Sequence, residues 1–212
     1  MEKEAFLERA LSTQLVAAPG GTYNYSNVGY SLLAAIIEER SAKTYETYLQ
    51  EDVLAPAGLD GLGYQSVYEP VRSLRSPEGQ PIGPVSWGGD RPYWNLIGNG
   101  GLLATPAALI RFLRAVDAGQ VISAASVELT RTAHVAADAA GTSHYGYGLV
   151  VEDVANVGRI SWHDGGNGTS SAEWMHVVGD GTVVFTAAAD ASGEAAFEAM
   201  AIVRSHLSGP PS

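Results

Sequence analysis

The chain has 212 residues, 46% of them hydrophobic and 17% charged, which is the composition of a folded globular protein and excludes a disordered chain. The formal net charge of −11 opposes binding to phosphate backbones and anionic membrane surfaces, and no cluster of Lys and Arg offsets it. We therefore expect neither nucleic acid nor membrane as a partner. Cysteine is absent, which excludes disulfides, thiolate catalysis and Cys-ligated zinc.

One domain over residues 1–207 with a flexible polar tail at 208–212 is the simplest organisation, because the sequence contains no internal repeat. Residues 1–15 form a charged amphipathic segment without the basic start, apolar run and cleavage site of a signal peptide. No stretch is long and apolar enough to span a bilayer. The sequence leaves the compartment open between the cytoplasm and export.

Two helices are predicted in the first half of the chain. Residues 28–40 place Val28, Leu32, Leu33, Ile36 and Ile37 on one helical face, and Ser26 or Asn27 is available as N-cap. A second helix is predicted over 45–54, because Pro56 and Gly58 end the pattern. The Gly- and Pro-rich stretch from there to about residue 94 is predicted to be irregular.

The second half of the chain predicts helices around an antiparallel sheet. Thr105 and Pro106 start a helix that ends at Gly119, and a shorter helix follows Ser123. Strand patterns follow at 145–151, 157–162, 171–178 and 182–189, separated by turn residues, and predict an antiparallel meander. An Ala-rich helix over 194–206 is expected to pack on one face of this sheet.

Four segments, at residues 19–38, 98–112, 145–149 and 163–168, carry motifs whose order resembles that of the serine β-lactamase and penicillin-binding-protein superfamily. Residues 19–38, PGGTYNYSNVGYSLLAAIIE, resemble its Tyr-x-Asn element at the start of a helix. Residues 98–112, GNGGLLATPAALIRF, resemble its Gly-Gly-Leu segment, and 145–149, YGYGL, resemble the strand before its third element. That third element is HDGGNG at 163–168, the His-x-Gly form of a motif that is Lys-Thr-Gly in many members. The resemblance covers about residues 4–207.

The resemblance implies a fold and a chemistry. The fold is α/β, an α+β sandwich in which an antiparallel sheet is flanked by helices beside a mostly helical region. The chemistry is acyl transfer through an acyl-serine, without metal or organic cofactor, on a small-molecule or peptide substrate. By matching position, Tyr25 accepts and donates the proton, Asn27 positions the substrate and His163 faces it. Gly165 and Gly166 belong to the substrate strand, and Gly166 gives one N–H to the oxyanion.

The nucleophile motif of the family, Ser-x-x-Lys, is missing from the sequence. No serine has a lysine three residues later, and Ser41 and Lys43 have the wrong spacing. In the family this motif lies well upstream of Tyr-x-Asn, together with strands and a helix of the sheet domain. We therefore expect the chain to be the C-terminal portion of a hydrolase, inactive alone, with an uncovered sheet edge that favours self-association.

Each assignment has an alternative. Tyr25 and Asn27 fit a helix cap with a packing tyrosine, and residues 163–166 fit a hairpin turn. Ser26 is interpreted as a cap rather than as a nucleophile, because it has no adjacent base in sequence. The remaining histidines show no zinc-binding spacing. Instead of a truncated enzyme, the chain is also compatible with a non-catalytic remnant that binds a ligand or partner, or with a half that another polypeptide completes.

Overall fold

The computed structural model describes residues 1–64, 93–168, 170–189 and 192–209. These residues form two compact units, which we describe separately: the first contains the described residues 1–64 and 93–109, and the second those from 110 onward. The predicted irregular stretch between about 58 and 94 falls mostly outside the described residues, as does the end of the predicted tail. None of the described helices has the length and apolar character needed to cross a membrane.

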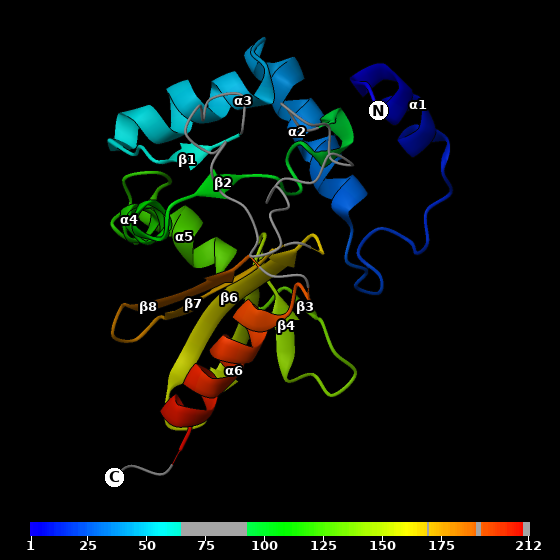
Figure 1. Ribbon diagram of the computed structural model, residues 1–212. Helices are drawn as coiled ribbons and strands as arrows, with labels where there is room; N and C mark the ends of the chain where they lie inside the picture. Colours follow the sequence, from blue (N-terminus) through cyan, green and yellow to red (C-terminus); the bar gives the residue numbers. More distant parts are fainter. Residues whose placement is uncertain (65–92, 169, 190–191, 210–212) are drawn as a thin grey trace. The chain divides into compact units, whose positions relative to one another are not determined.

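The first unit is mainly helical. Its helices are α1 (Lys3–Ser12), α2 (Asn27–Ser41) and α3 (Tyr45–Tyr48), and α3 continues into the π-helical η1 (Leu49–Leu54) and the 3-10 turn η2 (Ala55–Ala57). The short strands β1 (Leu62–Gly63) and β2 (Leu103–Ala104) pair antiparallel, and η6 spans Trp94–Leu96. The predicted helices at 28–40 and 45–54 are thus confirmed, the second with a π-helical end (Figure 1).

The core of the first unit lies against the small side chains of α2. Ala34 of α2 is buried together with Tyr64 and Ile97, and Ser31 and Ala35 of α2 are buried as well. The apolar face proposed from the sequence is different, because Val28, Leu33 and Ile36 are each about half exposed (48%, 51% and 57%). Small residues allow a neighbouring segment to approach the helix axis closely, so α2 packs through its small face.

The second unit is a six-stranded antiparallel meander with helices. Its sheet order is β3-β4-β5-β6-β7-β8, which is also the order in the sequence. The strands are β3 (Val135–Ala136), β4 (Ser143–Tyr145), β5 (Val150–Val154), β6 (Gly158–Gly166), β7 (Ser171–Val177) and β8 (Thr182–Ala188). The helices are α4 (Pro106–Asp117), whose first turn belongs to the first unit, α5 (Ala124–Thr130) and α6 (Ala195–Leu207).

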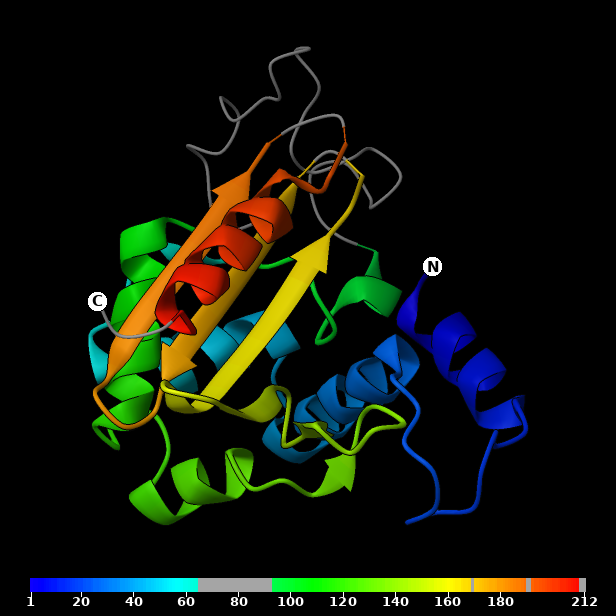
Figure 2. The same ribbon diagram turned by 90° about the horizontal axis from the view of Figure 1, so that it is seen from below.

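Helix α6 covers one face of this sheet, as predicted (Figures 1 and 2). Met200 of α6 is buried with Ile160, Met175 and Val177 of β6 and β7. Side chains alternate between the faces of a strand, so Trp162, which also packs on this cluster, shares its face with Asp164 and Gly166. His163 and Gly165 consequently project from the opposite face of β6.

Two sequence-based predictions about the strands need correction. The predicted strand at 145–151 is instead the end of β4, a turn and the start of β5, because Gly148 adopts a left-handed φ of 80° and the N–H of Gly146 donates to Leu149 O. The strand predicted over 157–162 extends as β6 to Gly166. The hairpin turn lies after it, where the Asn167 N–H donates to Ser170 O at 3.1 Å.

Candidate active site

The Tyr-x-Asn element lies at the start of α2, and Ser26 fixes its geometry. Ser26 is extended, with φ −143° and ψ 101°, and its Oγ accepts the N–H of Gly29 at 3.0 Å. This is the hydrogen bond of an N-cap, so Ser26 acts in capping, as interpreted from the sequence. Asn27 is the first helical residue, and Tyr25 precedes the cap with 51% of its surface exposed. The structure therefore brings Tyr25 and Asn27 together at one helix start.

A buried serine of α2, which the sequence motifs did not single out, ties this helix to residues 95–99. Ser31 Oγ lies 3.1 Å from Asn95 O and 2.9 Å from Ile97 O, and it accepts a hydrogen bond from Asn99 Nδ2 at 2.8 Å. The adjacent N–H of Gly98 donates to the Tyr64 hydroxyl at 2.9 Å. Because buried polar groups are costly unless paired, these bonds hold α2 and residues 95–99 in one register.

The His-x-Gly element forms the end of β6 in the second unit. His163 is half-buried and lies opposite Trp174 of β7. Its Nε2 lies 3.1 Å from the hydroxyl of Tyr145, and its Nδ1 lies 2.7 Å from Asp164 O. The histidine is therefore held by bonds at both ring nitrogens, one of them to a tyrosine at the end of β4.

Gly165 and Gly166 continue β6 beyond its neighbour β5. The β5 pairing ends at Trp162, which lies opposite Val150, whereas the β7 pairing continues to Gly166, opposite Ser171. Within the described residues, the strand from His163 to Gly166 thus has a strand partner on one side only. A Cβ on Gly165 would meet nothing within 4 Å, whereas one on Gly166 would lie 3.6 Å from Phe197 of α6.

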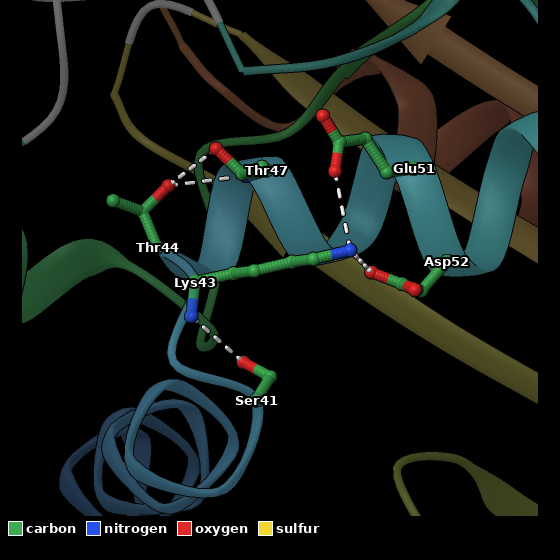
Figure 3. A network of polar contacts seen from close by, with 6 residues as sticks. All are labelled: Ser41, Lys43, Thr44, Thr47, Glu51 and Asp52. Carbon is green, nitrogen blue, oxygen red and sulfur yellow. Dashed lines mark hydrogen bonds and ion pairs between the residues drawn. The ribbon is translucent and has the colours of Figure 1, made fainter.

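The only serine and lysine close together in sequence, Ser41 and Lys43, do not form a nucleophile–base pair (Figure 3). Ser41 Oγ accepts the backbone N–H of Lys43 at 3.2 Å. The Lys43 ammonium points away to the next helix, 2.5 Å from Asp52 Oδ2 and 3.1 Å from Glu51 Oε2. The hydrogen bond to Asp52, followed by that to Glu51, raises the pKa of Lys43, so the ammonium is less able to lose its proton and become a base.

The site residues predicted from the sequence thus fall into two local groups. Tyr25 and Asn27 belong to the first unit, and His163, Gly165 and Gly166 belong to the second. Ser31 and Tyr145 are the residues that support these groups and that the motifs alone did not assign a role. The sequence carries no local signal for Ser31, whereas Tyr145 belongs to the YGYGL segment at residues 145–149.

Sequence relatives carry penicillin-binding-protein names. The chain is 29% identical over 164 residues to penicillin-binding protein 4* of Bacillus subtilis, covering 70% of this chain and 35% of that protein. It is 32% identical over 108 residues to the D-alanyl-D-alanine-carboxypeptidase/endopeptidase AmpH of Escherichia coli, covering 49% of this chain and 26% of that protein. The chain thus spans about a third or less of the length of these relatives.

Solved structures show the same fold. The penicillin-binding protein of Bacillus halodurans superposes with a TM-score of 0.75 at 18% identity, covering 96% of this chain and 61% of that one. The octameric penicillin-binding-protein homologue of Pyrococcus abyssi gives 0.72 at 24% identity, covering 94% and 47%. The β-lactamase family model matches residues 1–206. The chain therefore belongs to the β-lactamase family, which includes the penicillin-binding proteins, and has its mixed α/β fold.

Proposed function

We propose that this chain provides two of the three elements of a serine hydrolase site that cleaves or transfers an ester, amide or β-lactam acyl group. Tyr25 moves the proton, Asn27 positions the substrate, and the strand from His163 to Gly166 aligns it and gives an oxyanion N–H from Gly166. The nucleophilic serine and its lysine come from a Ser-x-x-Lys segment outside this sequence. The chain alone is then inactive.

The one-sided pairing of β6 is the observation that carries this proposal. Residues 163–166 pair with β7 on one edge, and the described residues place no strand on their other edge. An extended acyl substrate can align with such an edge through main-chain hydrogen bonds, as peptides do in strand addition. Gly165 adds to the fit, because no described side chain lies within 4 Å of the position that a Cβ would take there.

The ion pairs of the two lysines in this chain support an external lysine as the cation beside Tyr25. A phenol has a reference pKa of about 10, so it acts as a base near neutral pH only beside a cation. The chain has two lysines, and both are in ion pairs: Lys3 lies 2.6 Å from Glu38 Oε2, and Lys43 is bound by Asp52 and Glu51. The lysine of Ser-x-x-Lys would be the cation that activates Tyr25.

The substrate end that meets His163 is expected to be weakly charged or neutral. An imidazole carries less positive charge at pH 7 than the permanent ammonium of lysine, so it attracts a substrate carboxylate less strongly. We therefore favour an esterase- or peptidase-like activity over efficient β-lactam hydrolysis. AmpH of Escherichia coli, 32% identical over 108 residues, is named a carboxypeptidase/endopeptidase, which supports the peptidase side of this choice.

The first test measures the isolated chain with a p-nitrophenyl ester and a chromogenic cephalosporin. We expect no turnover above buffer, because the sequence lacks the Ser-x-x-Lys motif that supplies the activated hydroxyl in the family. Turnover that disappears in Tyr25→Phe would contradict the proposal and require a different nucleophile within these 212 residues.

The second test joins an N-terminal segment with Ser-x-x-Lys, taken from a family member, to this chain. We expect ester hydrolysis that Tyr25→Phe lowers by roughly 10² to 10⁴ in kcat, the usual contribution of a positioned proton-transfer group. Tyr23→Phe is the matched control. Burial, and then the neighbouring Tyr25, raise the pKa of Tyr23, so its phenol holds its proton more firmly. Equal loss in both variants would contradict the role of Tyr25.

A further inference from the structure

The pair formed by Tyr145 and His163 links two strands that are not neighbours in the sheet. Tyr145 ends β4 and is 8% exposed. It lies opposite Val150 of β5, which in turn lies opposite Trp162 of β6. Its hydroxyl reaches His163 Nε2 at 3.1 Å, and the two rings meet edge to face with centroids 6.2 Å apart. The tyrosine thus contacts β6 at His163, the first residue beyond the pairing with β5.

The two hydrogen bonds of His163 assign its tautomer. A backbone carbonyl can only accept, so the nitrogen that lies 2.7 Å from Asp164 O, Nδ1, must carry the proton. In a neutral imidazole the other nitrogen, Nε2, then accepts a hydrogen bond through its lone pair. The Tyr145 hydroxyl therefore donates its hydrogen to Nε2.

From this geometry we propose that Tyr145 is a positioning residue for His163. It holds the imidazole as the Nδ1–H tautomer and occupies the Nε2 lone pair, so His163 contacts the substrate as an oriented neutral ring and not as a general base. The effect of this role on catalysis rests on the proposed function. The tautomer itself is a property of the second unit and does not depend on catalysis.

The first arm of the test is ¹H–¹⁵N correlation NMR of the full chain labelled at histidine, at pH 8.5, where an unperturbed imidazole is neutral. His163→Gln identifies the His163 signals. We expect one tautomer, protonated at Nδ1, with the Nε2 resonance displaced by an accepted hydrogen bond. A His163 ring protonated at Nε2 would overturn the proposal in the wild-type chain, before any Tyr145 variant is made.

The second arm compares Tyr145→Phe with the wild type in the same experiment, with a thermal melt to check folding. The phenylalanine keeps the buried ring and removes the hydroxyl, so the Nε2 resonance should shift and the Nε2–H tautomer should gain population. Tyr147→Phe is the matched control, because Tyr147 is 61% exposed and stacks on His134 instead. An unchanged His163 Nε2 signal in Tyr145→Phe would contradict the proposal.

The third arm uses the joined enzyme and separates this inference from the proposed function. Tyr145→Phe should lower kcat/KM for a p-nitrophenyl ester by about 10- to 100-fold, the scale of a misplaced active-site group, while Tyr147→Phe changes little. A joined enzyme without activity, together with the expected NMR result, refutes the proposed function and leaves the Tyr145–His163 assignment standing. If Tyr145→Phe shifts the His163 Nε2 resonance but keeps full activity, the positioning role of Tyr145 is refuted, whereas the proposed function is not.

Discussion

The guanidinium of Arg204 on α6 lies 2.6 Å from Oε1 of Glu173 on β7, in the face of the sheet that α6 covers. The Glu173 side chain is only 8% exposed, whereas that of Arg204 is 26% exposed. Arg204 also lies over the ring of Trp162, 4.5 Å from its centroid, and 3.5 Å from Oε2 of Glu152. One arginine thus pairs with a buried carboxylate and packs on a tryptophan of the sheet.

Replacement of this arginine in Arg204→Met should destabilise the chain by about 2 kcal/mol, because it leaves the Glu173 carboxylate buried without its cation. Burial raises the pKa of Glu173, and Arg204 opposes this rise. Without Arg204 the folded-state pKa rises further above the unfolded value. The folded state then binds more protons than the unfolded state, so the variant loses stability as pH rises through that folded pKa.

The measurement is urea unfolding of the wild type and Arg204→Met at pH 5 and pH 8. The deficit should be larger at pH 8, and Glu173→Gln added to Arg204→Met should remove most of this pH dependence. An equal deficit at both values would show that lost packing on Trp162, and not the buried charge, accounts for the effect.

His176 should give stability the opposite pH dependence. It is 2% exposed on β7, and its Nε2 lies 3.1 Å from Oδ2 of Asp117. Burial lowers its pKa and outweighs the opposing effect of Asp117, while Arg131 lowers it further. A folded pKa below the unfolded value of about 6.5 means that the unfolded state binds more protons, so stability is lost as pH falls from there toward the folded pKa.

His176→Gln removes this titration, so its unfolding free energy should fall less than that of the wild type between pH 7.5 and pH 5.5. The comparison between the two proteins cancels the contribution of Glu173. His206→Gln, at an exposed position near the end of α6, is the control and should keep the wild-type slope. Identical slopes in all three proteins would show that His176 does not titrate differently in the folded state.

Gly98→Ala should destabilise the first unit by about 3 kcal/mol, through overpacking and an unfavourable φ together. Gly98 has a φ of 82°, and a Cβ there would lie 2.6 Å from Ala34 Cβ and 2.9 Å from Tyr30 O. Gly100→Ala is the control, because its Cβ would meet nothing within 4 Å, and a change within about 0.5 kcal/mol is expected. Thermal or urea unfolding compares the two, and equal stabilities would contradict the close packing at α2.

We expect the chain to self-associate through β8, which is an edge strand of the sheet formed by the described residues. Residues 182–188 read TVVFTAA, without charge or proline, a composition that invites pairing with another chain. Ala187→Lys places a charge at an exposed position of this strand and should lower the apparent mass in light scattering after size exclusion. Ala201→Lys makes the same charge change on the exposed side of α6 and should not. A monodisperse wild-type monomer would refute this expectation and favour a short protein whose sheet edge is protected from pairing with another chain.

The sequence was sufficient where a local signal decides the structure. Ser26, Thr105 and Ser123 are capping residues, and each accepts a backbone N–H at the start of the predicted helix, from Gly29, Ala108 and Ser126. The alternating strands from residue 171 onward and the final helix follow from periodicity in the same way. These features depend on residues that are two to four positions apart, so the local sequence pattern reveals them.

The sequence was insufficient where distant residues decide the structure. Gly165 and Gly166 were compatible with a turn, yet pairing with Ala172 and Ser171 makes them part of β6. Ser31 gained its role from residues 64 to 68 positions away, and Tyr145 from His163, 18 positions away. The buried face of α2 could not be inferred either. Its small residues are buried because a segment distant in the sequence packs on them, and the helix sequence alone does not reveal this contact.

The consecutive order of the six strands has a consequence for how the second unit folds. Every ladder joins strands that follow one another in the chain, so each pairing closes a short loop and costs little loop entropy. Such local topology is associated with fast folding, and single hairpins form in about 1–10 μs. The ladder from β3 to β8 can therefore assemble hairpin by hairpin from its own residues, without a strand crossover that must wait for the first unit.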